Sequence, residues 1–203
     1  MNTVSSYKPT SDEIKRLREE TGAGMMDCRA ALVAAAGDYG SARKGLVDQG
    51  MAKVAKKADR AANEGLVGSY IHVGGKIGVL VEINCETDFV ARNERFPELV
   101  RDIAMHVAAT PVKYVSREQV PAADLTTLRD SFAEAAAGKP AHVVDRIVEG
   151  KLNKWFEENV LLDQPFVKDD DQTVGELIGS VVGVLGEKIE VRRFAKFALG
   201  EPE

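Results

Sequence analysis

The sequence predicts an α+β protein, in which an N-terminal three-helix bundle precedes an antiparallel-sheet core with packed helices and a helical hairpin. Three observations indicate this class. Helical spacing with capping residues occurs near the amino terminus, strand alternation flanks a Gly-Gly turn, and two helical segments flank a Gly-Lys-Pro turn. We divide the chain into a bundle at 1–50, an Ala- and Lys-rich linker at 51–64, and a core at 65–203 with its helical hairpin at about 121–160.

The bundle is predicted from helix start and stop signals. Thr10 to Glu13 has the capping-box pattern that opens a helix, and the glycine-containing segment Thr21 to Gly24 ends it. A second helix follows from Met25 to Gly37. Asp38 can cap a third helix, which we expect to stop at Gly50.

The core is predicted from a change in periodicity. Residues alternate from Val67 to Val73 and again from Ile77 to Ile83, on either side of Gly74-Gly75, which is the pattern of a β-hairpin. Helical spacing then runs from Phe96 to Ala109, and Pro111 stops it. The remaining elements are a short strand at Val112–Val115, the helical hairpin around Gly138-Lys139-Pro140, a last helix at Val174–Val181 and a closing strand at Lys188–Leu199.

Size and charge limit the classes of partner. The chain has 203 residues, 44% of them apolar and 29% charged, as expected for a globular protein. The net charge is −5, although the first sixty residues carry eleven basic against eight acidic side chains. A mildly acidic protein repels phosphate backbones, so we expect no direct contact with nucleic acid. The stripe formed by Lys53, Lys56, Lys57 and Arg60 is interpreted as a solvated face, with an acidic partner as the alternative.

The sequence shows no sign of a membrane or of covalent catalysis. No apolar run approaches the roughly 18 residues that span a bilayer, and Met1 to Pro9 lacks a signal-peptide pattern, so we expect a cytoplasmic protein. Cys28 and Cys85 are far apart and share no ligand spacing with a histidine, which indicates reduced thiols and no metal site. Gly74-Gly75-Lys76 lacks the earlier glycine and the following Ser or Thr of a phosphate loop. We expect no cofactor and no enzyme.

The stretch from Asn84 to Asn93 lies at a strand-to-helix corner and allows two interpretations. In the first, Thr87 or Asp88 caps the following helix and Phe89 packs inward as its hydrophobic staple. In the second, the aromatic ring beside a carboxylate is a wedge that enters another protein. Spacing alone favours the first interpretation, because caps are common. His106 lies between apolar residues on a helix and is interpreted as a core histidine with satisfied hydrogen bonds.

This stretch resembles the signature of the bacterial elongation factor Ts family, whose members remove GDP from elongation factor Tu. The segment from Leu17 to Cys28 is similar to the same family. Further matches follow in order along the chain, at Ile103–Ala109, Gly138–Pro140, Gln164–Val167 and Ile189–Phe194. The resemblance implies an N-terminal bundle of the ubiquitin-associated type, and a core that carries the helical hairpin.

The resemblance also implies a set of contacts with the GTPase. Thr87, Asp88, Phe89 and Val90 match the motif that enters elongation factor Tu, where the ring disturbs the magnesium ion and the phosphate loop. Mg²⁺ is a major counter-charge for GDP, so its displacement weakens nucleotide binding. Arg18, Met25 and Met26 match a second contact, although at least one methionine is expected to face the bundle core. His106 becomes a weaker candidate for the interface.

Partners and stoichiometry follow from the same resemblance. Elongation factor Tu is expected to bind in its GDP-bound and nucleotide-free forms. Longer members of the family carry two related core subdomains, whereas this chain has motifs for one, so we expect a homodimer in a two-plus-two complex with the GTPase. The alternative function is a non-catalytic adaptor of the ubiquitin-associated type, which would leave nucleotide release unchanged.

Overall fold

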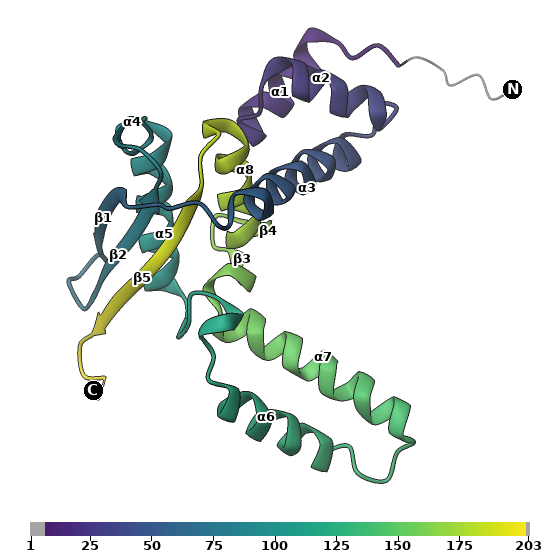
Figure 1. The fold of residues 1–203 in the computed structure, drawn as a ribbon, viewed down its shortest axis with the longest axis vertical. Coiled ribbons are helices and arrows are strands. Elements are labelled where there is room, and N and C mark those ends of the chain that lie inside the picture. The colour runs from purple at the N-terminus through teal and green to yellow at the C-terminus, as the bar shows by residue number, and fades with distance from the viewer. Residues whose placement is uncertain (1–6, 202–203) are drawn as a thin grey trace, which may run out of the picture. The chain divides into compact units, whose positions relative to one another are not determined.

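The computed structural model describes residues 7–201 and combines helices with small sheets, which matches the predicted α+β class (Figure 1). The likeness of the N-terminal helices to the ubiquitin-associated type stays a prediction. In chain order, the elements are α1 (Ser11–Thr21), α2 (Met25–Ala34), α3 (Tyr39–Lys57), β1 (Glu64–Ile71), β2 (Ile77–Cys85), α4 (Asp88–Ala91), α5 (Arg95–Ala109), η1 (Arg117–Gln119), α6 (Ala122–Glu134), α7 (Ala141–Asn159), η2 (Leu161–Asp163), β3 (Pro165–Phe166), β4 (Asp169–Thr173), α8 (Val174–Leu185) and β5 (Ile189–Ala198).

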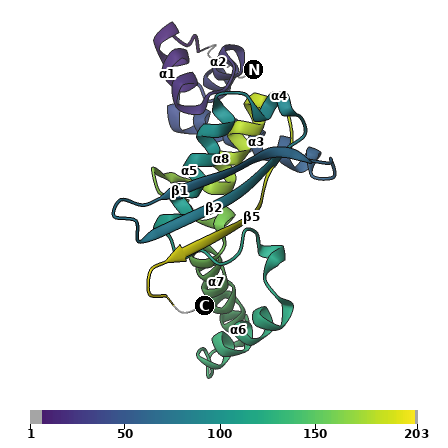
Figure 2. The ribbon, with the colours of Figure 1, turned by 90° about the vertical axis from the view of Figure 1, so that its left-hand side faces the viewer.

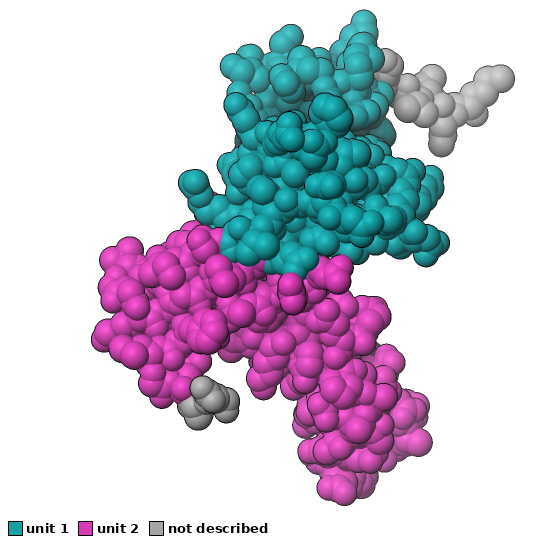
Figure 3. Space-filling view, turned by 60° about the vertical axis from the view of Figure 1, so that its left-hand side comes forward, with its two compact units in different colours: residues 1–68, 82–102, 176–191 teal, residues 69–81, 103–175, 192–203 magenta. Residues whose placement is uncertain are grey.

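The chain forms two compact units, each built from several segments (Figure 3). Unit 1 contains the chain up to Gly68, with Glu82–Asp102 and Glu176–Val191. Unit 2 contains Ser69–Val81, Ile103–Gly175 and the chain from Arg192. The predicted domain boundaries at 50 and 64 stay predictions.

The N-terminal helices of unit 1 form as their capping residues predict. Thr10 and Glu13 make the reciprocal capping box of α1, and Gly22 ends that helix at a φ of +68°. Asp38 accepts a hydrogen bond from the Ser41 backbone N–H at 2.8 Å and so caps α3. The bundle core contains the side chains of Leu17, Cys28, Ala31, Leu32, Ala42 and Leu46.

The prediction that Gly50 stops the third helix is wrong, because α3 continues to Lys57. Gly50 is instead a point of close approach between helices: a Cβ atom there would lie 2.6 Å from the carbonyl oxygen of Gly179 in α8. Two lysines of the basic stripe reinforce this contact. Lys53 Nζ donates to the Gly183 carbonyl oxygen at 3.2 Å, and Lys57 Nζ donates to the Gly186 carbonyl oxygen. Part of the stripe therefore binds the carbonyl end of α8, where positive charge is favourable.

The central sheet has the strand order β1–β2–β5 (Figure 2). The predicted hairpin is confirmed, and Gly74 and Gly75 adopt φ values of +93° and +70° in its turn. In unit 2, one face of the sheet buries Val79 and Val81 together with the α5 residues Ile103 and Val107. Alternation along β2 then places Leu80 on the opposite, exposed face.

The predicted helical hairpin is also confirmed in unit 2, where α6 and α7 pack together around a core that includes Leu152 and Phe156. The predicted strand at Val112–Val115 is wrong. That segment makes one isolated parallel bridge, between Tyr114 and Val160. The pairing does not extend into a strand, because η1 begins at Arg117 and η2 begins directly after Val160. The short hairpin β3–β4 was not predicted, since its acidic second strand, Asp169–Thr173, shows no apolar alternation.

Candidate partner-binding site

Phe89 projects from a corner between β2 and the four-residue helix α4. Its side chain is 82% exposed, so the interpretation of Phe89 as an inward-packing staple is wrong. Thr87 occupies the N-cap position in an extended conformation, yet its side chain makes no capping hydrogen bond. Val90 and Ala91 are the buried residues of α4. Neighbouring helical positions point about 100° apart, so burying Val90 turns the ring of Phe89 outward.

The corner is held by polar contacts on both sides of Phe89. Arg92 Nη2 lies 2.8 Å from Asp88 Oδ2, so an ion pair joins the first residue of α4 to its C-cap residue. The Cys85 thiol, at the buried end of β2, donates to the Thr87 carbonyl oxygen at 3.2 Å. Burial raises the pKa of this thiol. Both Cys28 and Cys85 are free and buried, in agreement with the predicted reduced thiols.

A carboxylate that sequence reasoning missed also holds this corner. Glu187 accepts two hydrogen bonds from Thr87, one from the backbone N–H at 3.0 Å and one from the hydroxyl at 2.6 Å. A hundred positions separate the two residues in the chain, and no local pattern relates them. The one feature of the sequence that could have indicated this role is the position of Glu187 in the connection between α8 and β5. A carboxylate in such a connection has backbone N–H donors within reach.

The three N-terminal candidates are all on the surface of unit 1. Arg18 lies on an exposed part of α1. Met25 is 48% exposed and Met26 is 70% exposed, so the expectation that one methionine faces the bundle core is wrong. Both methionines begin α2, whereas the buried residues of that helix are Cys28, Ala31 and Leu32. Two adjacent exposed methionines supply a flexible apolar surface of the kind that binds other proteins.

His106 belongs to unit 2 and is fully buried. Its Nε2 lies 2.9 Å from Gln164 Oε1, and its Nδ1 accepts a hydrogen bond from the Val167 backbone N–H at 3.2 Å. Gln164 uses its amide nitrogen to donate to the Glu158 carbonyl oxygen, which leaves its oxygen as the acceptor for His106. Burial lowers the pKa of His106. The interpretation as a satisfied core histidine is confirmed.

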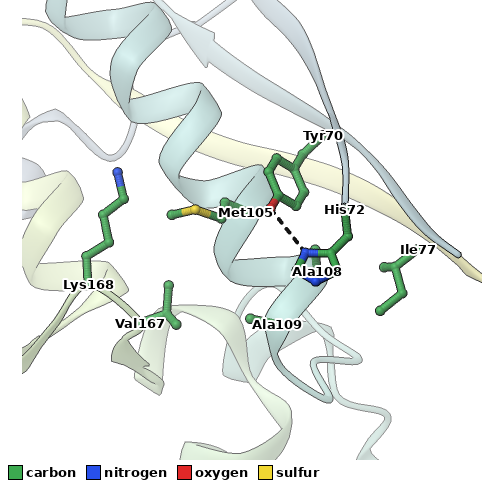
Figure 4. A pocket seen from close by; sticks show the side chains of 8 residues that line it. All are labelled: Tyr70, His72, Ile77, Met105, Ala108, Ala109, Val167 and Lys168. Carbon is green, nitrogen blue, oxygen red and sulfur yellow. Dashed lines mark hydrogen bonds between the residues drawn. The ribbon is translucent and has the colours of Figure 1, made fainter. Parts of the chain in front are cut away.

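A shallow cavity of about 450 Å³ lies beside this histidine, within unit 2 (Figure 4). Its wall includes Val167, whose N–H binds His106, and Met105 and Ala108 of α5. At its edge the Tyr70 hydroxyl and His72 Nδ1 are 3.2 Å apart. Within residues 7–201, no group of three or more His, Cys, Asp or Glu side chains is placed to hold a metal ion. None of the helices in the same range is long and apolar enough to cross a membrane.

Comparisons with known proteins agree along nearly the whole chain. The family model described as Elongation factor TS matches residues 50–201. The protein named Elongation factor Ts from Citrifermentans bemidjiense is 50% identical over 194 residues, which cover 95% of this chain and 90% of that relative. The protein of the same name from Caldanaerobacter subterraneus is 51% identical over 194 residues, which cover 95% of this chain and 97% of that relative.

Exposed apolar anchors on fixed elements are typical of proteins that act by binding a partner. The comparisons place this chain within one such class, and the resemblance seen in its motifs is confirmed. The chain belongs to the elongation factor Ts family.

Proposed function

We propose that this protein is a guanine-nucleotide exchange factor for elongation factor Tu in translation elongation. Membership of the elongation factor Ts family supports the proposal. The observation that carries it is the exposure of Phe89 at a corner where the backbone of Thr87 is hydrogen-bonded through both its carbonyl oxygen and its N–H. A ring held in this way can enter a partner without first being released from its own core.

In the proposed mechanism, Thr87, Asp88, Phe89 and Val90 form the element that disturbs the magnesium and phosphate site of the GTPase. Phe89 supplies the wedge, while Val90 is buried and keeps α4 attached to its own unit. No covalent step is needed. If the factor lowers the affinity for GDP, GDP lowers the affinity for the factor by the same ratio. Rebinding of nucleotide therefore expels the factor, which is not consumed and acts repeatedly in the cytoplasm.

Arg18, Met25 and Met26 form the proposed second contact, and the exposure of both methionines supports it. His106 is proposed as a minor and indirect contributor. Its ring holds the backbone of Val167, whose side chain is exposed, so His106 can shape the surface without touching the partner. The GTPase is the proposed partner in both its GDP-bound and nucleotide-free forms, and no nucleic acid is involved.

The proposed assembly is a homodimer that carries two copies of the GTPase. It is supported by the large apolar side chains that are exposed on the sheet of unit 2 and in its turn: Ile71, Val73, Leu80 and Phe197. A contiguous apolar surface on a soluble protein marks an interaction site. A second copy of the chain also supplies the second core that longer family members have.

A release assay tests the proposed function. Catalytic amounts of the protein are added to elongation factor Tu loaded with fluorescent GDP, with unlabelled nucleotide in excess. We expect the label to leave faster than it does spontaneously, and excess Mg²⁺ to reduce the effect. An unchanged rate at saturating protein would reject the exchange function and favour the alternative of a non-catalytic adaptor of the ubiquitin-associated type.

A further inference from the structure

Two corners of unit 1 hold each other through reciprocal hydrogen bonds. One lies between β2 and α4 and contains Glu86 and Thr87; the other lies between α8 and β5 and contains Glu187 and Lys188. Glu187 Oε2 accepts from the Thr87 backbone N–H at 3.0 Å. In return, Glu86 Oε1 accepts from the Lys188 backbone N–H at 2.6 Å. We call this arrangement the Glu86–Glu187 clasp.

The clasp is supported by Arg60, which follows α3, and by Lys57 at the end of that helix. Arg60 Nη1 lies 3.3 Å from Glu86 Oε1, and Lys188 Nζ donates to the Arg60 carbonyl oxygen at 3.0 Å. Gly186, which precedes Glu187, adopts a φ of +77° as the chain leaves α8, and its carbonyl oxygen accepts from Lys57. The residues on either side of Glu187 are therefore both held, Gly186 by Lys57 and Lys188 by Glu86, and this fixes the backbone from which Glu187 binds Thr87.

Helix α4 needs such external support. It contains four residues, far fewer than the roughly 12 that an isolated helix requires. Thr87 does not cap it with its side chain, because its hydroxyl donates to Glu187 Oε1 at 2.6 Å instead. The ring of Phe89 is mostly in solvent and adds little packing of its own. The direction in which Phe89 leaves the corner thus depends on the backbone of Thr87.

We propose that Glu187 is a positioning residue for nucleotide exchange, which fixes the direction of Phe89 by binding the backbone N–H and the hydroxyl of Thr87. This inference rests on the proposed exchange function. Glu187 acts through Phe89 and does not itself enter the partner. Its effect on exchange therefore exists only while the ring of Phe89 is present.

The substitution Glu187→Gln tests this role without leaving a cavity. An ionised carboxylate has acceptors on both oxygens, whereas the amide has one acceptor oxygen and one NH₂ donor. Glutamine can satisfy one of the two Thr87 donors, and its NH₂ group then faces the other. Thr87→Val removes the hydroxyl donor from the opposite side, and Thr87→Ser retains it. Glu98→Gln is the matched control, because Glu98 is an exposed carboxylate of the same unit.

The experiment is a double-mutant cycle on GDP release from elongation factor Tu, measured at saturating factor with the full-length proteins. Glu187→Gln and Phe89→Ala are made singly and together, under conditions in which Phe89→Ala still exceeds the spontaneous rate. We expect Glu187→Gln to slow release about tenfold in the wild-type background, as for loss of a hydrogen bond to a charged group. In the Phe89→Ala background we expect no further slowing. Glu98→Gln should stay within about twofold of the wild type, and Thr87→Ser should release GDP faster than Thr87→Val.

Circular dichroism and thermal melting accompany each variant. Equal slowing by Glu187→Gln in both backgrounds would overturn the proposal, because Glu187 would then act independently of Phe89. No slowing in either background would also overturn it, because Glu187 would then have no role in exchange. If Glu187→Gln does not fold, the same cycle is measured with Thr87→Val in its place. The hydroxyl is then tested by comparing Thr87→Val with Thr87→Ser, which keeps the donor to Glu187. Failure of the wild-type protein to accelerate release is a separate result, because it rejects the exchange function itself.

Discussion

Phe89 keeps an apolar ring in water while the protein is alone, and a partner that covers the ring gains the free energy of its burial. For a phenyl side chain this gain is roughly 1.5–3 kcal/mol. Because the ring is 82% exposed, removing it takes little away from the folded state of the free protein. A substitution of Phe89 should therefore weaken partner binding while leaving the stability of the free protein almost unchanged.

The first prediction compares two phenylalanines of unit 1. Phe89→Ala should slow GDP release by about tenfold to a hundredfold, since each 1.4 kcal/mol is about a factor of ten. Its melting temperature should stay near that of the wild type. Phe96→Ala removes a fully buried ring and should destabilise the fold by about 3–5 kcal/mol. Release assays and thermal melts on the same preparations measure both. Normal exchange by a folded Phe89→Ala variant would contradict the wedge.

The second prediction concerns the pH dependence of stability at His106. Burial lowers the pKa of this ring in the folded protein, so the unfolded chain binds the proton more readily. The free energy of unfolding should therefore fall as the pH drops below about 6.5, by at most about 1.4 kcal/mol per pH unit from this group. Urea titrations between about pH 5.5 and 7 measure the slope.

The variant His106→Asn is the comparison for this slope. Its side-chain oxygen can still accept from the Val167 N–H, but the side chain does not titrate. The variant should be less stable throughout and should depend less on pH over this range. An unchanged slope would show that other groups cause it.

Sequence reasoning located the residues of the motifs but not the contacts that fix them. Phe89, Met25 and Met26 were identified because they lie in recognisable segments. The outward direction of Phe89 follows from the burial of Val90, and no pattern within this short segment shows which of the two residues is buried. Glu187 was missed for the same reason, because a hydrogen bond across a hundred positions leaves no periodic signal.

At the scale of elements, periodicity predicted the long helices and the β1–β2 hairpin, and capping residues predicted where α1 and α3 begin. The end of α3 was not predictable in this way. Glycine weakens a helix through backbone entropy, so Gly50 resembles a stop when it is considered alone. Its contact with Gly179 of α8 shows a different use, in which the missing side chain lets two helices approach closely.

The third prediction compares two glycines of α3. Gly50→Ala places a methyl group 2.6 Å from the Gly179 carbonyl oxygen and should destabilise the protein by about 1–3 kcal/mol. Gly45→Ala meets nothing within 4 Å and should stabilise it by about 0.5–1 kcal/mol, because alanine favours the helix. Denaturant unfolding measures both. Equal effects at the two positions would mean that α3 does not pack against α8 in solution.

At the scale of the whole molecule, the exposed apolar side chains of the sheet need an explanation. Tyr70 lines a cavity with α5 residues, Val79 is buried, and Lys196 Nζ donates to the Thr110 carbonyl oxygen just after α5. The exposed side chains of Ile71, Leu80 and Phe197 are the next residues along the three strands, so they lie on the face of the sheet opposite to α5. A sheet with one buried face usually carries polar residues on the other. Apolar residues on both faces indicate that the second face is covered as well, and a second copy of the chain would cover it with the same surface.

The last prediction is that the protein is a homodimer and that Phe197→Asp separates it. Light scattering of the wild type should give close to twice 22.0 kDa. A carboxylate at position 197 would be buried without a partner in the dimer, so this variant should give 22.0 kDa at the same concentration. Phe89→Asp is the matched control, because it places the same charge at another exposed phenylalanine, which lies on α4 and not on the sheet, and it should remain dimeric. A wild-type mass of one chain at all concentrations would contradict the dimer. A dimeric Phe197→Asp variant would instead place the interface away from this face of the sheet.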